Sequence, residues 1–178
     1  MSYTLDTNCI IDLEENRPDA THLKKLIYGS RNHGISLAVV AIGASENQPG
    51  GAESSNFEAF LLKLEKADLH DAEIILPMLY CEVGFWDRAV WAGSPGAEEL
   101  EVEIHNILFP GTPIENPKAE NFSVKKWKNN KCDVQVAWAH VYHGRETLVT
   151  RDENFHKNAD ALRSVGFKNI IRPKDIRV

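Results

Sequence analysis

Residues 3–8 read Tyr-Thr-Leu-Asp-Thr-Asn, and residues 148–155 read Leu-Val-Thr-Arg-Asp-Glu-Asn-Phe. In each stretch a short apolar or β-branched run, typical of a buried strand, ends near an acid, Asp6 in the first and Asp152 in the second. Ligands of open α/β sheets bind in the crevice outside the carboxyl ends of the strands. We therefore expect Asp6 and Asp152 to lie at one such edge.

The rest of the chain alternates between short apolar segments and longer amphipathic ones, which predicts an α/β fold. The segments predicted as strands are 3–5, 35–41, 73–76, 147–150 and 169–171, and those predicted as helices are 21–30, 56–67, 97–108, 134–143 and 158–165. Their order favours a single-domain α/β/α sandwich over residues 1–178, with a central, mostly parallel sheet of about five strands.

Three segments stand apart from this alternation. Glycine, serine and proline predict loop insertions near residues 47–55 and 109–118. The segment 80–91 is apolar enough to be a helix, and its aromatic side chains are expected in the core in preference to a subunit interface.

Two further acids stand where this fold would bring them to the same edge. Glu46 follows the second predicted strand, and Asp133 lies at the start of the helix that precedes the strand ending near Asp152. Several carboxylates in one cleft raise one another's pKa values unless a cation neutralises them. Hard oxygen ligands favour Mg²⁺ or Mn²⁺ over zinc, and such ions orient a scissile phosphate and lower the pKa of an attacking water.

The motifs Leu5-Asp6-Thr7-Asn8 and Thr150-Arg151-Asp152-Glu153-Asn154-Phe155 resemble those of the PIN-domain nucleases. The first strand of that family ends in an Asp followed by small polar residues, and a late strand ends in Thr-x-Asp-x-x-Phe. The resemblance spans residues 3–172 and implies a PIN-like nuclease that needs Mg²⁺ or Mn²⁺. It implies metal ligation by Asp6, Glu46, Asp133 and Asp152, with Asn8, Thr150 and Asn154 supporting these ligands.

Two features depart from the family pattern. Glu46 is followed by Asn-Gln-Pro-Gly-Gly at 47–51, where the family continues directly into a helix. Asn154 stands where many relatives place a further acid, which lowers the negative charge offered to a metal.

Each acid also has an ordinary structural interpretation. Asp6 and Asp152 can cap a following helix through their side-chain oxygens. Asp133 suits the first turn of a helix, where the macrodipole favours negative charge. Glu46 can be a solvated residue of a turn-rich loop.

The cations best placed for a nucleic-acid backbone lie just before Asp133. They are Lys125, Lys126, Lys128 and Lys131, and Trp127 among them is placed to stack on a base. The alternative is a solvated, lysine-rich loop. Further candidates for phosphate contact are Arg145 and Arg151, which flank the last acid-bearing strand.

Three histidines lie in the same half of the chain. His140 and His143 are expected to be packed or surface residues in preference to zinc ligands, because a pair without a third ligand at suitable spacing is a weak metal motif. His156 could approach the cleft from its position after Phe155.

Composition narrows the function classes. No apolar run reaches membrane-spanning length and no signal-peptide pattern is present, so we expect a cytoplasmic protein. Three widely spaced cysteines, Cys9, Cys81 and Cys132, predict reduced core thiols. The net charge of −6 argues against a broadly basic nucleic-acid surface, so contact with RNA would depend on local cations and on bound metal.

These observations predict a metal-dependent endoribonuclease that cuts single-stranded RNA. The resemblance adds a toxin of a toxin-antitoxin pair, held by a protein antitoxin, and a homodimer. A different interpretation keeps the PIN-like fold as a catalytically inactive RNA-binding or protein-interaction module. A third uses the same acids in a phosphohydrolase of small molecules.

Overall fold

The computed structural model describes residues 1–46, 53–80, 83–91, 93, 96–117 and 122–177. Five strands form one sheet in the order β3-β2-β1-β4-β5, and all neighbouring strands are parallel. The strands are β1 (Ser2–Leu5), β2 (Ser36–Val40), β3 (Glu73–Ile75), β4 (Thr147–Val149) and β5 (Asn169–Ile171). The predicted α/β fold is confirmed, and each predicted strand agrees with the structure to within one residue at either end.

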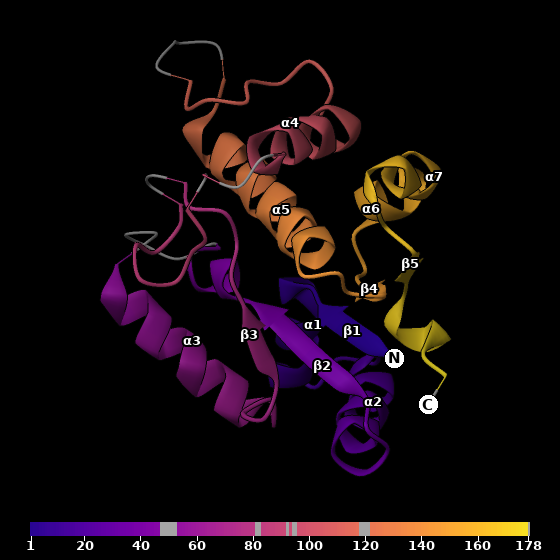
Figure 1. Cartoon of the computed structure of the whole chain (residues 1–178). Coiled ribbons are helices and arrows are strands. Elements are labelled where there is room, and N and C mark those ends of the chain that lie inside the picture. The colour runs from indigo at the N-terminus through magenta and orange to yellow at the C-terminus, as the bar shows by residue number, and fades with distance from the viewer. Residues whose placement is uncertain (47–52, 81–82, 92, 94–95, 118–121, 178) are drawn as a thin grey trace.

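Helices cover both faces of this sheet, as Figure 1 shows. Leu37 and Val39 of β2 belong to the core formed with α1 (Thr7–Glu14), α2 (Ala20–Asn32) and α3 (Ser54–Lys66). Ala38 and Val40 alternate with them and belong to the core formed with α4 (Ala97–Leu108), α5 (Val124–Tyr142) and α7 (Ala159–Leu162). Because both faces of each central strand are buried, the strands read as continuous apolar runs.

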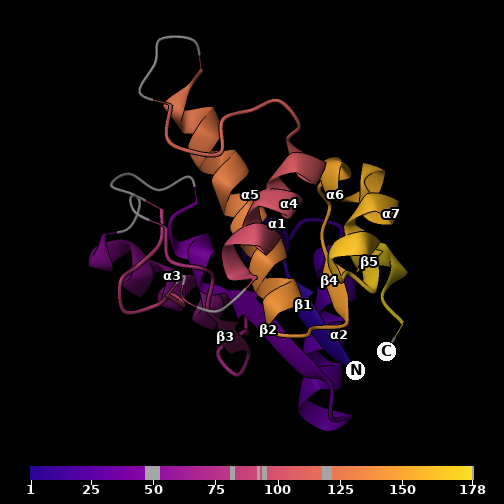
Figure 2. The same ribbon diagram turned by 45° about the horizontal axis from the view of Figure 1, so that its top comes forward.

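Short helices complete the arrangement. The α-helix α6 (Glu153–Lys157) precedes α7, and 3₁₀ turns form η1 (Ala41–Ala44), η2 (Arg163–Val165) and η3 (Pro173–Asp175). Both ends of the chain lie side by side, as Figures 1 and 2 show from two directions. Among the described residues, no helix has the length and apolar character needed to cross a membrane.

Helix α5 differs from its prediction because it begins at Val124, ten residues before the predicted start. The Ser123 hydroxyl caps it by accepting from the backbone N–H of Lys126 at 3.4 Å. The lysine-rich segment, for which a solvated loop was the alternative interpretation, is therefore helical, since lysine is a good helix former. Helix α1 was absent from the predicted helices, and the predicted helix 158–165 is divided between α7 and η2.

The segment 80–91 is not a helix where it is described, and residues 81–82 lie outside the described residues. The Leu79 N–H donates to the Val90 carbonyl and the Val90 N–H donates to the Pro77 carbonyl, which forms a parallel bridge between Met78 and Val90. Phe85 is buried as expected. Trp86 and Trp91 are 65% and 64% exposed and contact each other at 5.5 Å between ring centroids, so the prediction of a core position is wrong for both.

The loop and cysteine predictions hold in part. No helix or strand forms between 109 and 117, but α3 begins at Ser54, inside the predicted 47–55 loop, whose residues 47–52 lie outside the described part of the chain. Cys9 and Cys132 are buried free thiols, as expected, whereas Cys81 lies outside the described residues.

Candidate functional site

Asp6 lies at the carboxyl end of β1 and is also the N-cap of α1. Its Oδ1 accepts from the backbone N–H of Thr7 at 2.7 Å. Its Oδ2 accepts from the Asn8 amide and from the Thr150 hydroxyl, both at 2.5 Å. The side chain is only 4% exposed, so these three donors hold a nearly buried carboxylate in one orientation.

Thr150 joins the two stretches of sequence that suggested the fold, because β1 and β4 are neighbours in the sheet. Its hydroxyl oxygen accepts from the Asn8 amide at 3.0 Å and from the backbone N–H of Asp152 at 2.9 Å, while it donates to Asp6. Asn8 in turn accepts from the backbone N–H of Arg151 at 3.1 Å. Asn8 and Thr150 therefore both hold the Asp6 carboxylate by hydrogen bonds.

Asp152 is the N-cap of α6 and accepts from the backbone N–H of Asn154 at 2.8 Å. The Asn154 side chain points elsewhere, because it donates to the Leu108 carbonyl at 2.9 Å and accepts from Asn158 at 3.0 Å. Its supporting contact to Asp152 is thus made by the backbone, and its amide ties α6 to the end of α4. Asp6 and Asp152 therefore each cap a helix and also lie at the edge of the sheet where the site is expected.

The electrostatics of the four acids show that they share one region. The pKa of Asp6 is raised to about 7. Burial is the largest cause, the charge of Glu46 comes second, and the charge of Asp152 contributes more weakly. The pKa of Asp133 is raised well above its ordinary value, first by burial and then by Asp6, Glu46 and Asp152. Burial and Asp152 also raise the pKa of Glu46, against a hydrogen bond from Thr7 that lowers it.

A cation suits this set of side chains by its chemistry. The four carboxylates offer hard oxygen donors, and a buried group of like charges is stabilised by a positive ion. No three His, Cys, Asp or Glu side chains in the described part of the chain already stand in the arrangement of a metal site. The acids are therefore electrostatic neighbours whose oxygens would have to approach one another around an ion.

Two of the expected substrate contacts are corrected by the structure. The Lys131 side chain is fully buried, 2.6 Å from Glu101 Oε1 and 4.0 Å from the centre of the Tyr80 ring. Trp127 is 1% exposed and donates from its indole to the Ile114 carbonyl, so it cannot stack on a base. Both side chains pack in the core because the segment is a helix facing α4, with its polar ends paired inside the protein.

The other lysines of this segment keep access to solvent. Lys125 and Lys126 are exposed and Lys128 is half-buried. The charge of Lys128 opposes the rise in the pKa of the buried Cys132 thiol, the neighbour of Asp133. Lys126 lies over the Phe122 ring at 5.5 Å.

Arg145 serves a structural purpose away from the acids. Its guanidinium donates to the Tyr3 and Ser36 carbonyls at 2.8 and 3.0 Å and lies 3.1 Å from Glu73. These partners belong to three different strands near their amino ends. The expectation of a phosphate contact is therefore wrong for Arg145.

The histidines are packed or surface residues, as expected. His140 is fully buried, with Nδ1 at 3.0 Å from the Thr4 hydroxyl and its ring stacked on Phe167. Burial lowers the pKa of His140 to about 3, with further lowering by Arg145. His143 is exposed and lies 3.0 Å from the Leu76 carbonyl, and His156 is 2.9 Å from the Thr150 carbonyl at the edge of the site.

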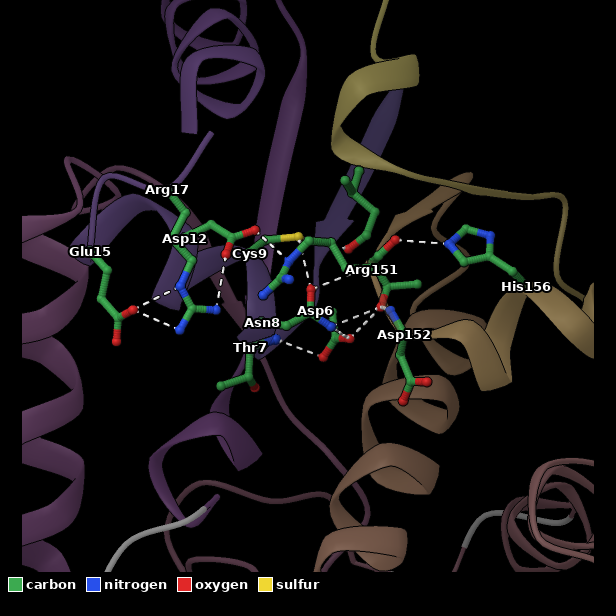
Figure 3. A network of polar contacts seen from close by, with 12 residues as sticks. Asp6, Thr7, Asn8, Cys9, Asp12, Glu15, Arg17, Arg151, Asp152 and His156 are labelled. Atoms are coloured by element: carbon green, nitrogen blue, oxygen red, sulfur yellow. Dashed lines mark hydrogen bonds and ion pairs between the residues drawn. The ribbon is translucent and has the colours of Figure 1, made fainter. Parts of the chain in front are cut away.

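One part of the site was missed by the sequence analysis. Asp12 of α1 is a buried carboxylate whose Oδ2 lies 2.6 Å from Nε of Arg151, and Arg17 lies 3.6 Å from its Oδ1 (Figure 3). Arg17 also contacts Glu15 at 2.6 Å. The apolar pattern around Asp12, with Ile10, Ile11 and Leu13 beside it, was the available signal, because a carboxylate in an apolar run needs a partner.

Comparisons with known proteins add little to this geometry. Neither protein-family models nor curated proteins match the chain. The fold is similar to a solved structure titled VapBC2 from Rickettsia felis bound to a DNA fragment from their promoter. The two are 19% identical over 97% of this chain and 98% of that one, with a TM-score of 0.46.

Proposed function

We propose that this protein is a PIN-like, metal-dependent endoribonuclease that hydrolyses phosphodiester bonds of single-stranded RNA. The observation that carries the proposal is the electrostatic coupling of Asp6, Glu46, Asp133 and Asp152, which come from four separate parts of the sequence. Structural frameworks seldom gather four carboxylates at one edge of a sheet, because each adds to the cost of ionising the others.

The four acids would hold Mg²⁺ or Mn²⁺ through their oxygens. Such an ion, when bound, neutralises negative charge on a phosphate and lowers the pKa of an attacking water. Asn8 and Thr150 fix the orientation of the Asp6 carboxylate through their hydrogen bonds. With a pKa of about 7, Asp6 exchanges its proton near neutral pH, so a positive charge beside it would drive it fully into the ionised form.

Lys126 and Lys128 are the cations proposed to contact the RNA backbone, because both reach solvent near the helix turn that carries Asp133. Each lost phosphate contact should weaken binding and reduce its dependence on salt. Lys126→Met and Lys128→Met should therefore each weaken RNA binding and make the RNA affinity less dependent on salt concentration. Lys25→Met, on α2, is a matched control that should leave both quantities unchanged.

The deciding experiment offers labelled single-stranded RNA, duplex RNA, single-stranded DNA and a small phosphoester to the protein with Mn²⁺, Mg²⁺ or EDTA. The parent is compared with Asp6→Asn/Asp133→Asn and with Asp160→Asn, which removes an exposed carboxylate on α7. We expect metal-dependent cutting of single-stranded RNA by the parent and the control only. Cutting of the small phosphoester alone would instead indicate a phosphohydrolase.

A second function is favoured by one specific observation. No ready metal arrangement exists among the described acids, and Asn154 holds α4 instead of adding a donor. These features suit a PIN-like module that binds RNA or a protein without cutting. A folded parent that binds single-stranded RNA but neither binds Mn²⁺ nor cuts any polymer would favour this alternative.

The toxin role extends the proposal. A toxic ribonuclease would arrest growth when expressed alone and would be neutralised by a protein that covers the acidic edge. Expression of the parent and of Asp6→Asn/Asp133→Asn in the same host tests this role, with growth as the readout. Equal growth from both, with active parent enzyme recovered from the cells, would argue against a toxin. Gel filtration tests the proposed homodimer, and fractionation tests the proposed cytoplasmic location.

A further inference from the structure

Arg151 occupies an unusual position for a cation. It lies in the chain between Thr150, which donates to Asp6, and Asp152, which belongs to the acidic group. Its backbone N–H is held by Asn8, a residue that also contacts Asp6. Since adjacent Cα atoms are about 3.8 Å apart, the Arg151 side chain starts beside Asp152 and one residue from the hydroxyl that holds Asp6.

The guanidinium nevertheless points to a different carboxylate. Arg151 Nε lies 2.6 Å from Oδ2 of Asp12, and Figure 3 shows this contact beside the hydrogen bonds of Asp6. Asp12 is 1% exposed, whereas Arg151 is 35% exposed. Arg17 supports the same carboxylate from 3.6 Å, so a buried acid is shared between two arginines.

The Asp12 contact is a short ion pair whose hydrogen-bond alignment is poor. Among the described residues, neither Asp12 oxygen has a well-aligned hydrogen-bond donor and Arg151 Nε has no aligned acceptor. A pair of this kind depends on charge, so it directs the guanidinium without locking it. An arginine released from Asp12 would be free to turn towards Asp152, its neighbour in the chain, and towards Asp6, which Thr150 holds.

We propose that Asp12 is a positioning residue that keeps the guanidinium of Arg151 away from Asp6 and Asp152, and so leaves these carboxylates available to a divalent cation. Arg151 would otherwise occupy the acids itself, because guanidinium binds carboxylates well. The inference rests on the metal site proposed above and assigns to α1, which Asp6 caps, a role in that site through Asp12.

The test measures Mn²⁺ affinity by isothermal titration in the parent, Asp12→Asn, Arg151→Met and Asp12→Asn/Arg151→Met. We expect Asp12→Asn to weaken Mn²⁺ binding by about tenfold or more, as loss of a residue supporting a metal ligand usually does. Arg151→Met and the double variant should bind Mn²⁺ within about twofold of the parent. Glu15→Gln is the matched control, because it removes a carboxylate from the same region that contacts Arg17 and not Arg151.

The rescue separates this role from a merely structural one. If Asp12 only tied α1 to the turn after β4, Arg151→Met would weaken Mn²⁺ binding as much as Asp12→Asn, and the double variant would not recover. Either result overturns the proposal. If Asp12→Asn does not fold, Arg151→Met and the double variant still test the proposal. Mn²⁺ affinity like that of the parent in both variants supports it. A loss of Mn²⁺ affinity beyond tenfold in either variant contradicts it.

Failure of the proposed function looks different. A folded parent that binds no Mn²⁺ removes the metal site, and with it this role of Asp12. A parent that binds Mn²⁺ together with an unchanged, folded Asp12→Asn variant removes only the positioning role. Both outcomes are read without any assay of RNA cleavage.

Discussion

Replacing the buried Asp6 by asparagine should stabilise the metal-free fold above neutral pH, although it removes hydrogen bonds, because the ionised form of this buried acid weakens that fold. The pKa of Asp6 rises from 3.8 to about 7 on folding, mainly through burial. A rise of about three pH units corresponds to about 4 kcal/mol. The sign follows from proton binding: the folded state holds the proton more tightly, so stability falls as pH rises from 3.8 to about 7 and stays low above that value.

Asparagine removes the charge but not all of its partners. Its oxygen can still accept from Thr7, whereas its NH₂ group would face the donors Asn8 and Thr150. Losing these two hydrogen bonds costs about 1 kcal/mol each. We therefore expect Asp6→Asn to be more stable than the parent by about 2 kcal/mol at pH 8 in EDTA, and less stable than the parent near pH 4.

Urea unfolding at pH 4, 6 and 8, with EDTA present, measures the two free energies at each pH. Asp160→Asn controls for the change in net charge, because that carboxylate is 93% exposed. Added Mn²⁺ at pH 8 should raise the melting temperature of the parent and not that of Asp6→Asn. A difference between parent and variant that stays constant from pH 4 to pH 8 would refute the argument, since it would show that ionising Asp6 carries no penalty.

Three further predictions concern the frame of the site. The pKa of the buried His140 is about 3 in the folded state, against an ordinary value of 6.5. The free energy of unfolding should therefore fall by up to about 1.4 kcal/mol per pH unit as pH drops from 6.5 towards 3. His140→Gln should reduce this pH dependence, as measured by urea unfolding. Lys131→Met should cost about 3–5 kcal/mol by leaving Glu101 buried and unpaired, and adding Glu101→Leu should recover most of the loss by the same measurement. Gly43→Ala should lower the unfolding free energy by about 1–3 kcal/mol, because its methyl group would lie 3.1 Å from the Thr7 hydroxyl oxygen.

The sheet could be predicted because its information is local. Each strand is a short run of apolar or β-branched residues, Asp6 follows one of them directly, and Asp152 follows another after Thr150 and Arg151. Parallel strands place such ends at one edge by geometry alone. The hydrogen bond between Asp6 and Thr150 is the direct result.

The predictions that failed concern side chains whose partners are distant in sequence. Lys131 looked like a surface cation because Glu101, which allows its burial, stands 30 residues earlier and on another helix. Trp127 is buried for a related reason, since the carbonyl that satisfies its indole belongs to Ile114. The pairing of Asp12 with Arg151 spans nearly the whole chain, and only the folded structure brings them together.

The separation of Asp6 from Thr150 has a consequence for the protein during its own synthesis. The two residues stand 144 positions apart, so a growing chain exposes Asp6 for most of translation with neither β4 beside it nor a hydroxyl to hold it. Contacts this distant in sequence also form late in folding, because a long loop must close first. Asp6 therefore gains the hydroxyl that orients its carboxylate only after Thr150 has left the ribosome, so this edge of the sheet is completed late in synthesis.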